Sequence, residues 1–355
     1  MKSSGALAAA VLSLGLAALG VTSVAATEEN FVSTPLVMGE VFTLKSTVFG
    51  GDRRIVVRIP FYYYDAEPER RFTTVYIIDG GPEQDFPHLA GLAQSGEVNA
   101  TFEPVILVGI ETVNRRAEIT PPATDVETYS EELGAEPGGS SDFRRFIAED
   151  VKPFIEARYR TSGRDAVIGE SLAGLFIVET LFKTPDLFDD YIAVSPSMWW
   201  ENMEYGRDAK SFLKALPEGE RRLYLTIGNE GLRHKNGLDL LVAALKKSAP
   251  EGLKWLYVPQ SGSETHASIY HGAALDAFRA FYGEPTKSGR PGVLLSGAPL
   301  GELTEQQKVQ RAAPCDRATA RLATPENQYR DAEIKPYECL LIDLGPRAAA
   351  GNFDR

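Results

Sequence analysis

Eight short runs of β-branched and aromatic residues recur along the chain, and segments with helical periodicity separate most of them. This alternation constrains the fold most, because short apolar runs bounded by turn residues are typical of buried strands. The predicted strands are Val41–Phe49, Arg54–Pro60, Thr73–Asp79, Val105–Ile110, Ala166–Gly169, Tyr191–Ser195, Leu223–Ile227 and Trp255–Pro259. The predicted helices are Phe143–Tyr159, Leu172–Lys183, Leu238–Lys247 and Ser268–Phe281.

The composition of these runs predicts how the strands pair. The first two are joined by Gly50-Gly51-Asp52, a turn sequence that favours an antiparallel hairpin. The later ones are almost wholly apolar, which is typical of strands covered on both faces in a parallel sheet. Apolar residues make up 43% of the chain, enough for a sizeable core. We therefore predict an α/β fold with one mostly parallel eight-stranded sheet and helices on both faces.

The two ends of the chain lie outside this alternation. Residues 1–26 combine an early lysine, an apolar stretch and the small residues Ala25 and Ala26, the pattern of a secretory signal peptide. The alternative is an uncleaved membrane anchor, but the stretch is near the lower length limit and only weakly hydrophobic. We predict an exported protein, periplasmic or secreted, without stable membrane insertion after cleavage. Residues 27–283 would form the α/β domain, and residues 284–355 a C-terminal extension.

Cys315 and Cys339 are the two cysteines of the chain, and both fall in the predicted extension. Because oxidising compartments favour pairing, export predicts a disulfide between them. Two separate buried thiols are the alternative. Neither cysteine has a histidine at ligand spacing, so the sequence predicts no metal site.

The charge balance narrows the range of partners. Asp and Glu number 49 against 37 Lys and Arg, a formal net charge of −12. A surface this acidic repels phosphate backbones, so nucleic-acid binding is not expected. We expect a small-molecule substrate, and no cofactor-binding motif is evident.

The segment Gly169–Ala173 joins an apolar strand to an apolar helix through a serine, Ser171. In a nucleophile elbow the serine occupies a strained turn, and the residues two before and two after it must be small because strand and helix pass closely. Gly169 and Ala173 meet this requirement. The alternative is a serine that caps a helix.

A serine hydroxyl needs a base, and the chain has four histidines. In α/β-hydrolase order the base follows the last strand, and His266 lies in a polar loop directly after Trp255–Pro259. His271 falls inside the next helix, where packing or solvation is expected. His234 fits an exposed helix start, and His88 comes too early in the chain.

The acid of such a triad lies after the penultimate strand, where Glu230 follows Leu223–Ile227. A carboxylate there can fix the tautomer of the imidazole. Asp239 is the alternative acid, about two turns into the next helix, and a role for Glu230 in helix N-terminal electrostatics is the alternative to catalysis.

An ester hydrolase also needs oxyanion donors and a substrate pocket. We predict the donors from the backbone N–H of Leu172 and from the turn that contains Gly80 and Gly81. Aromatic and cationic side chains that follow strand ends are predicted to bind substrate, with core packing as the alternative for the two indoles. These residues are Trp199, Trp200, Arg115 and Arg116.

Four segments together resemble a known family: Tyr76–Gly80, Ile168–Gly174, Ser195–Trp200 and Glu264–His266. They are similar to the esterase family of α/β-hydrolases that includes enterobactin-type siderophore esterases, feruloyl esterases and S-formylglutathione hydrolase. The resemblance runs from about Val41 to Tyr282 and implies the α/β-hydrolase fold. It also implies Ser171 as nucleophile, His266 as base and Leu172 as an oxyanion donor.

Three functions are weighed on this basis. The first is an exported serine carboxylic-ester hydrolase that acts through a Ser-His-Glu triad and an acyl-enzyme, on a small or medium ester of aromatic or siderophore type. The second is an acyltransferase on the same scaffold. The third is a catalytically silent binding protein with the hydrolase fold, which the ordered presence of Ser171, Glu230 and His266 disfavours.

Overall fold

The structure is a computed structural model, and it describes residues 33–283. The predicted signal peptide, the predicted extension and both cysteines lie outside the described residues. Those expectations therefore stay predictions.

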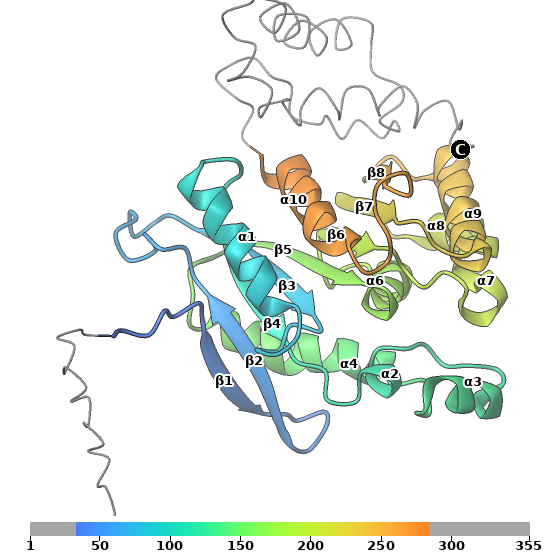
Figure 1. Ribbon diagram of the computed structural model, residues 1–355, viewed down its shortest axis with the longest axis horizontal. Coiled ribbons are helices and arrows are strands. Elements are labelled where there is room, and N and C mark those ends of the chain that lie inside the picture. Colours follow the sequence, from blue (N-terminus) through green and yellow to red (C-terminus); the bar gives the residue numbers. More distant parts are fainter. Residues whose placement is uncertain (1–32, 284–355) are drawn as a thin grey trace, which may run out of the picture. The chain divides into compact units, whose positions relative to one another are not determined.

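The described residues form eight strands and a set of helices (Figure 1). The strands are β1 (Glu40–Lys45), β2 (Asp52–Arg58), β3 (Phe72–Ile78), β4 (Val105–Ile110), β5 (Thr161–Glu170), β6 (Asp190–Val194), β7 (Arg221–Ile227) and β8 (Leu253–Pro259). The helices are α1 (Phe86–Val98), α2 (Arg115–Glu118), α3 (Val126–Leu133), α4 (Ser140–Phe146), α5 (Lys152–Glu156), α6 (Leu172–Lys183), α7 (Trp200–Arg207), α8 (Ala209–Ala215), α9 (Leu232–Ser248) and α10 (Ile269–Tyr282), with a π-helical turn η1 (Ile147–Val151) between α4 and α5.

All eight strands belong to one sheet with the order β1-β2-β4-β3-β5-β6-β7-β8. β1 pairs with β2, and β2 with β4, in antiparallel fashion, while every other neighbouring pair is parallel. The predicted sheet, including its antiparallel hairpin, is confirmed.

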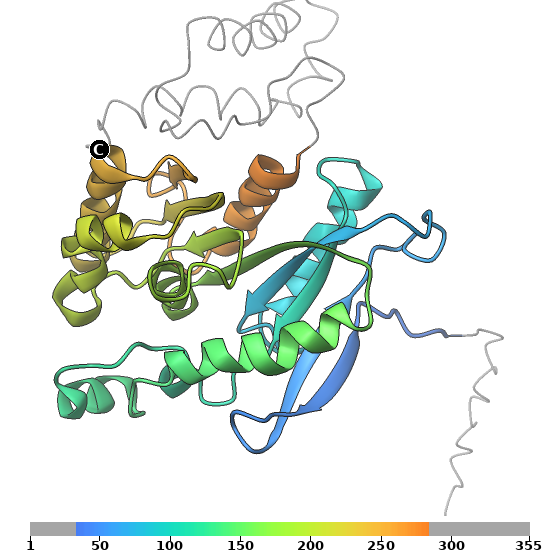
Figure 2. The same cartoon turned by 180° about the vertical axis from the view of Figure 1, so that it is seen from behind.

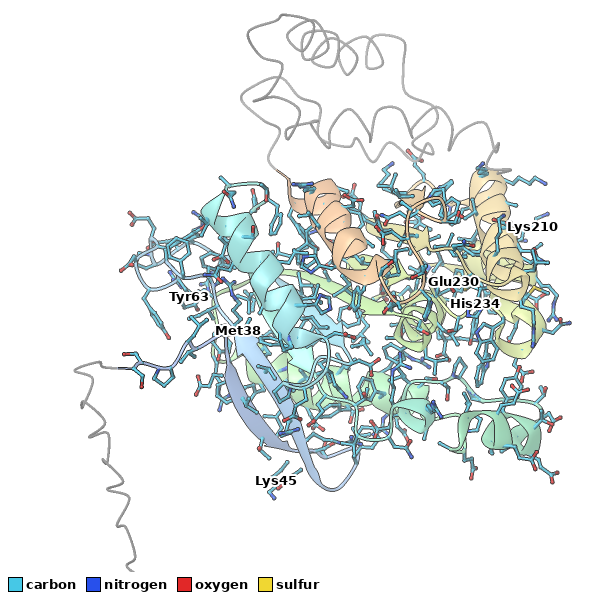
Figure 3. All side chains as sticks on the ribbon, viewed as in Figure 1. Met38, Lys45, Tyr63, Lys210, Glu230 and His234 are labelled. Atoms are coloured by element: carbon cyan, nitrogen blue, oxygen red, sulfur yellow. The ribbon has the colours of Figure 1, made fainter. Side chains whose placement is uncertain are left out.

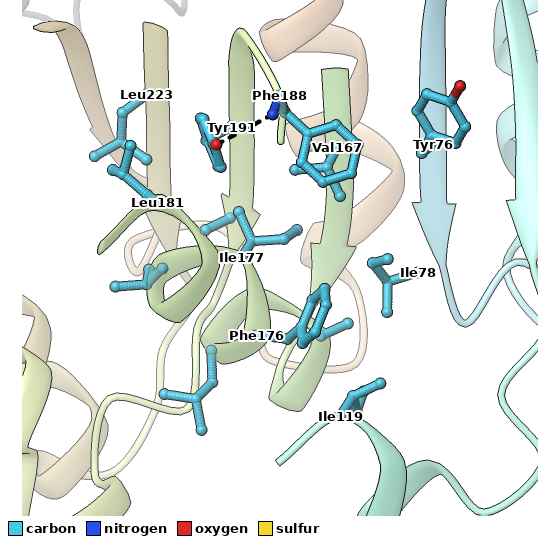
Figure 4. Close-up of a cluster of buried hydrophobic side chains, with 14 of the residues drawn as sticks. Tyr76, Ile78, Ile119, Val167, Phe176, Ile177, Leu181, Phe188, Tyr191 and Leu223 are labelled. Carbon is cyan, nitrogen blue, oxygen red and sulfur yellow. Dashed lines mark hydrogen bonds between the residues drawn. The ribbon is translucent and has the colours of Figure 1, made fainter. Parts of the chain in front are cut away.

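Helices cover both faces of the sheet, because each inner strand buries its two sets of alternating side chains. In β3, Val75 and Ile77 pack in a cluster with α1 and α10, whereas Tyr76 and Ile78 pack with α4, α6 and α9. Figures 1 and 2 show α1 and α10 on one side of the sheet and α4 and α6 on the other. Figure 4 shows part of the second cluster, where Val167 of β5 lies near Phe176 and Ile177 of α6.

The region from Thr120 to Ser140, where no helix is predicted, contains the short helix α3. Its residues are mostly polar, so hydrophobic periodicity did not predict it. The helix is held at its ends instead: the Asp125 side chain accepts the Thr128 N–H (3.1 Å), and Gly134 ends it with a φ of 68°. The predicted helix Phe143–Tyr159 is present as α4, η1 and α5 in succession.

The parallel strands bring the predicted site together. β3, β5, β6, β7 and β8 all end at the same edge, so the residues that follow them along the chain are neighbours there. This carboxyl edge carries Ser171, Glu230 and His266. Within residues 33–283, no helix is both long and apolar enough to cross a membrane.

Candidate active site

Ser171 lies in the sharp turn between β5 and α6. Its φ of 62° and ψ of −118° are rare for a residue with a side chain, a strain that costs about 1–3 kcal/mol and is typical of functional sites. A Cβ added at Gly169 would lie 2.6 Å from the Ala173 Cβ. The strand and the helix therefore approach as closely as the small residues of the motif predict.

The turn is also fixed to the neighbouring strand β6. The Ser171 N–H donates to the Val194 carbonyl (3.0 Å), and the Ser197 N–H donates to the Ser171 carbonyl (3.0 Å). A Cβ at Gly174 would lie 2.9 Å from the Pro196 Cα. The Ser171 hydroxyl, 3.4 Å from the Ser197 Oγ, is thus held by backbone contacts on both sides.

The loop after β8 brings His266 to the acid. His266 Nδ1 lies 3.1 Å from Glu230 Oε1, while Nε2, the other ring nitrogen, is available to act on a serine hydroxyl. The loop is held against the end of β7, because the Asn229 N–H donates to the Glu264 carbonyl (2.7 Å). Gly228 permits this approach, since a Cβ there would lie 2.9 Å from the Thr265 carbonyl carbon.

The two groups shift each other's pKa in the directions that an ion pair requires. The hydrogen bond that His266 donates to the Glu230 carboxylate raises the pKa of His266, against the opposing effect of burial, and the charges of Glu230 and Glu170 raise it further. Burial alone would raise the pKa of Glu230, whose side chain is 4% exposed, but hydrogen bonds from His266 and Ser195 bring it below its ordinary value. The carboxylate is therefore ionised at neutral pH and stabilises a protonated imidazole.

Two residues that the sequence analysis did not assign support Glu230. His234 Nε2 lies 3.7 Å from Glu230 Oε2, and the two are labelled in Figure 3 where β7 leads into α9. His234 is half-buried rather than fully exposed, and burial lowers its pKa. Ser195, with a φ of 40°, also accepts the Gly228 N–H on its Oγ (3.0 Å). The four-residue spacing of Glu230 and His234, one helical turn, is the sequence feature that could have predicted this contact.

The alternative acid, Asp239, lies on α9 with a side chain that is 45% exposed. Its Oδ2 accepts a hydrogen bond from Lys235 Nζ on the same helix surface. Asp239 is thus engaged on the surface of α9, whereas Glu230 contacts the imidazole.

The N–H groups of the predicted oxyanion donors differ in the hydrogen bonds that they already make. Leu172 is the first residue of α6, where backbone N–H groups have no partner within the helix. The Gly80 N–H donates to the Ile110 carbonyl (2.8 Å), so this amide is already engaged at the end of β4. The Gly81 N–H donates to the Gln84 side chain (2.9 Å), a partner that a substrate can displace.

The two predicted indoles occupy different environments. Trp199 is partly exposed, its ring stacks on Tyr129 of α3 (6.4 Å between centroids, 6° between planes), and it meets His234 edge to face. Trp200 is fully buried, with 0% exposure, so substrate contact by Trp200 is not what this structure shows. Its ring packs against Tyr129 from within the core (4.5 Å between centroids).

Both predicted arginines are engaged by the protein. Arg115 Nε donates to Asp79 Oδ2 (2.5 Å), and its Nη2 donates to the Glu170 carbonyl (3.3 Å). Arg115 thereby joins the ends of β3 and β5 beside Ser171. Arg116 Nη1 donates to the Leu133 carbonyl (2.5 Å), which turns this guanidinium toward the end of α3 and away from the predicted role.

In the part of the chain that the structure describes, three or more His, Cys, Asp or Glu side chains are nowhere grouped so as to hold a metal ion.

Residues 46–273, more than half of the chain, match the family described as "Putative esterase". The chain belongs to this esterase family. The family agrees with the resemblance carried by the sequence motifs.

Three curated relatives of the chain are named as esterases. The chain is 30% identical over 183 residues to ferri-bacillibactin esterase BesA of Bacillus subtilis, which covers 47% of this chain and 63% of the relative. It is 30% identical over 194 residues to siderophore triacetylfusarinine C esterase of Aspergillus fumigatus, covering 51% and 63%. It is 46% identical to siderophore enterobactin esterase of Emericella nidulans over 79 residues, covering 21% and 26%. The chain thus spans less than two thirds of the length of these relatives.

Solved structures show the same fold. An IroE-like serine hydrolase from Shewanella oneidensis superposes with a TM-score of 0.63 at 24% identity, covering 88% of this chain and 98% of that one. The BES protein from Bacillus cereus superposes with a TM-score of 0.61 at 23% identity, covering 71% and 97%. The predicted α/β-hydrolase fold is confirmed.

Proposed function

We propose that this esterase is a serine carboxylic-ester hydrolase in which Ser171 is the nucleophile, His266 the general base and Glu230 the acid. The observation that carries the proposal is the 3.1 Å contact between His266 Nδ1 and Glu230 Oε1, at the sheet edge where the strained Ser171 turn also lies. A buried, ionised carboxylate on Nδ1 leaves Nε2 as the nitrogen that exchanges protons with the serine.

The reaction follows from these roles. His266 removes the proton of Ser171 as its Oγ attacks the ester carbonyl, and the N–H groups of Leu172 and Gly81 donate to the oxyanion. The protonated imidazole then gives its proton to the departing alcohol, which leaves an acyl-enzyme. Water, activated by the same imidazole, attacks the acyl carbonyl, and collapse of the second oxyanion frees the acid and restores Ser171.

The substrate that we propose is a small or medium ester of siderophore or aromatic type. The names of the relatives support a siderophore ester. Tyr129 and Trp199 support an aromatic or planar group, since their stacked rings form a partly exposed surface next to His234, whose ring in turn lies 6.1 Å from that of His266. We also propose that the protein is exported, on the strength of the signal-peptide pattern in residues 1–26.

Labelling with a fluorophosphonate tests the mechanism, because only an activated serine reacts quickly with it. Wild-type protein is expected to be labelled at Ser171, which peptide mass spectrometry identifies, and Ser171→Ala is expected to lose the label. Ser197→Ala is the matched control, since its hydroxyl lies 3.4 Å from Ser171 Oγ and its loss should leave labelling in place. Labelling that survives in Ser171→Ala would contradict the proposal.

A panel of esters tests the substrate class. We expect p-nitrophenyl acetate and butyrate, a feruloyl ester and a metal-free siderophore ester to be hydrolysed more efficiently than p-nitrophenyl palmitate. Trp199→Ala should raise KM for the aromatic and siderophore esters more than for the acetate, since only the larger esters reach the indole. A preference for palmitate would contradict this class. Formation of a new ester with an added alcohol, faster than hydrolysis, would indicate an acyltransferase instead.

A further inference from the structure

Beside Ser171, on the side of α1 and α10, two buried polar atoms lack a hydrogen-bond partner among the described residues. They are the Oε1 of Glu170 and the hydroxyl of Tyr270. Glu170 ends β5 directly before the nucleophile, and Tyr270 is the second residue of α10. Asp85, just before α1, completes this group, which we call the acidic subsite: Asp85, Glu170 and Tyr270. The mechanism described above uses none of the three.

Tyr270 is 6% exposed, and its ring packs edge to face against His88 of α1 (4.9 Å between centroids). Burial raises the pKa of its hydroxyl well above the ordinary value, and the negative charges of Asp85, Glu170 and Asp79 raise it further. The hydroxyl is therefore protonated at neutral pH and can act as a hydrogen-bond donor or acceptor. A buried hydroxyl and a buried carboxylate oxygen without partners are costly in a folded protein unless a ligand or water meets them.

The cations around this subsite are already engaged. Arg115 donates to the Asp79 carboxylate and to the backbone carbonyl of Glu170. His266 faces Glu230. Since none of these contacts reaches the carboxylate of Glu170, its negative charge has no hydrogen-bonded counterpart among the residues that the structure describes.

The two remaining histidines near the subsite face each other. His88 Nδ1 lies 3.4 Å from His271 Nδ1, a distance at which one nitrogen must accept the proton of the other. Burial lowers the pKa of His271, and the proximity of His88 lowers it further. Both effects disfavour the charged form of His271. His88 Nε2 lies 3.6 Å from Asp85 Oδ1.

We propose that the acidic subsite receives an alkylammonium group of the substrate, next to the ester carbonyl that Ser171 attacks. The inference rests on the proposed function and narrows its substrate class to esters that carry a protonated or quaternary amine. A cation supplies the partner that Glu170 lacks, and Tyr270 adds the negative end of its hydroxyl dipole. Phenolate or carboxylate groups would meet repulsion on this side of the nucleophile.

The pH dependence of this selection follows from the surroundings of Glu170. Burial raises its pKa to about 7, the charges of Asp85 and Glu230 act in the same direction, and those of His266 and Arg115 oppose them. Glu170 thus gains its negative charge as the pH rises past neutrality. Preference for a cationic ester should therefore be stronger at pH 8 than at pH 6.

Two pairs of esters, matched in shape and different in charge, test the proposal. Butyrylthiocholine is compared with S-(3,3-dimethylbutyl) thiobutyrate, which replaces the quaternary nitrogen by carbon in the leaving group. Nα-acetyl-lysine methyl ester is compared with Nα-acetyl-norleucine methyl ester, which lacks the ammonium of the acyl side. The substrate charges are constant from pH 6 to pH 8, so any change in preference belongs to the enzyme.

The readout is the ratio of kcat/KM for the charged and the neutral member of a pair. In wild-type protein at pH 8 we expect a ratio of about ten or more in one of the pairs, the effect of one partly desolvated charge contact. The ratio should fall toward one at pH 6. Glu170→Gln should bring it near one at both pH values, Asp85→Asn should lower it partly, and Asp142→Asn, an exposed carboxylate on α4, should leave it unchanged.

A ratio at or below one in both pairs would overturn the subsite, as would a ratio that Glu170→Gln does not lower. Because the ratio compares two substrates of one variant, a partly misfolded preparation does not change it. If the neutral esters are hydrolysed by wild type and not by Ser171→Ala, the proposed function stands whatever the ratio. If no ester of either pair is hydrolysed, the proposed function fails and the subsite with it.

Discussion

At the amino edge of the sheet, Asp190 begins β6 with a carboxylate that is fully buried, and three groups surround it. Arg164 Nη2 lies 2.6 Å from Oδ1, Arg222 Nε lies 2.6 Å from the same oxygen, and the Tyr282 hydroxyl donates to Oδ2 (3.0 Å). At the carboxyl edge, Glu170 ends β5 with a buried oxygen that has no such partner in residues 33–283.

The difference lies in how the chain distributes its arginines. Arg164 and Arg222 sit on the strands that flank Asp190, so pairing of β6 with β5 and β7 brings both guanidiniums to one carboxylate. At the other edge Arg115 is engaged by Asp79, and no guanidinium donates to the carboxylate of Glu170 among the described residues. A buried charge that is fully paired holds strands together, whereas one that is left unpaired is available to a ligand.

Ser171→Ala is the strongest test of whether the carboxyl edge of the sheet serves catalysis and the amino edge serves stability. We expect kcat/KM for ester hydrolysis to fall about 10⁴-fold or more, because nucleophile and base act as a unit. The free energy of unfolding should stay within about 1 kcal/mol of wild type, since the hydroxyl makes only a long contact with Ser197. Steady-state kinetics and urea unfolding measure the two quantities. A large loss of stability would show that the carboxyl edge is structural as well.

Asp190→Asn should have the opposite profile. Removing the charge leaves two partly exposed guanidinium groups, those of Arg164 and Arg222, without the buried carboxylate that joins them. We expect this to lower the free energy of unfolding by about 3 kcal/mol. The kcat of the protein that remains folded should be unchanged, because Asp190 lies at the far edge of the sheet.

The matched control for that variant is Asp186→Asn. Its carboxylate also pairs with an arginine, Arg221, but the side chain is 81% exposed, so the expected loss is below about 1 kcal/mol. Equal losses in the two variants, measured by urea unfolding, would show that burial does not distinguish the two ion pairs.

The apolar strands and helices were predicted from the sequence more accurately than the polar segments around the site. β4 and α6 begin and end where periodicity placed them, because both are apolar and closely bounded by turn residues. α3 was not predicted, since its polar sequence is fixed by caps at Asp125 and Gly134 rather than by a buried stripe. Elements that depend on apolar runs can be predicted from the sequence, whereas capped polar helices are predicted much less often.

The candidate site shows the same limit. The order and spacing of motifs along the chain were enough to predict Ser171, Glu230 and His266 as candidate site residues. Burial of Trp200, the hydrogen bond that occupies the Gly80 amide, and the orientation of Arg116 toward Leu133 all depend on contacts between residues distant in sequence. The environment of Glu170 depends on such contacts too, because the motif leaves the residue before the serine unspecified.

The pH dependence of kcat/KM compares the two carboxylates that act on the pKa of His266, Glu230 and Glu170. The hydrogen bond and charge of Glu230 raise the pKa of the imidazole, and the charge of Glu170 adds to this, so the group stays protonated above the ordinary value of 6.5. A general base must be neutral, so kcat/KM should rise with pH through a value above 6.5.

Glu230→Gln removes both the charge and the ionic hydrogen bond, which should move this rise to lower pH and lower the plateau by about 10²- to 10⁴-fold. Glu170→Gln removes a charge without a hydrogen bond, so the rise should move in the same direction by a smaller amount. Asp239→Asn, which changes an exposed carboxylate on α9, should leave the profile in place. If Asp239→Asn moves the rise further than Glu230→Gln, then Asp239 and not Glu230 is the acid that faces the imidazole during catalysis.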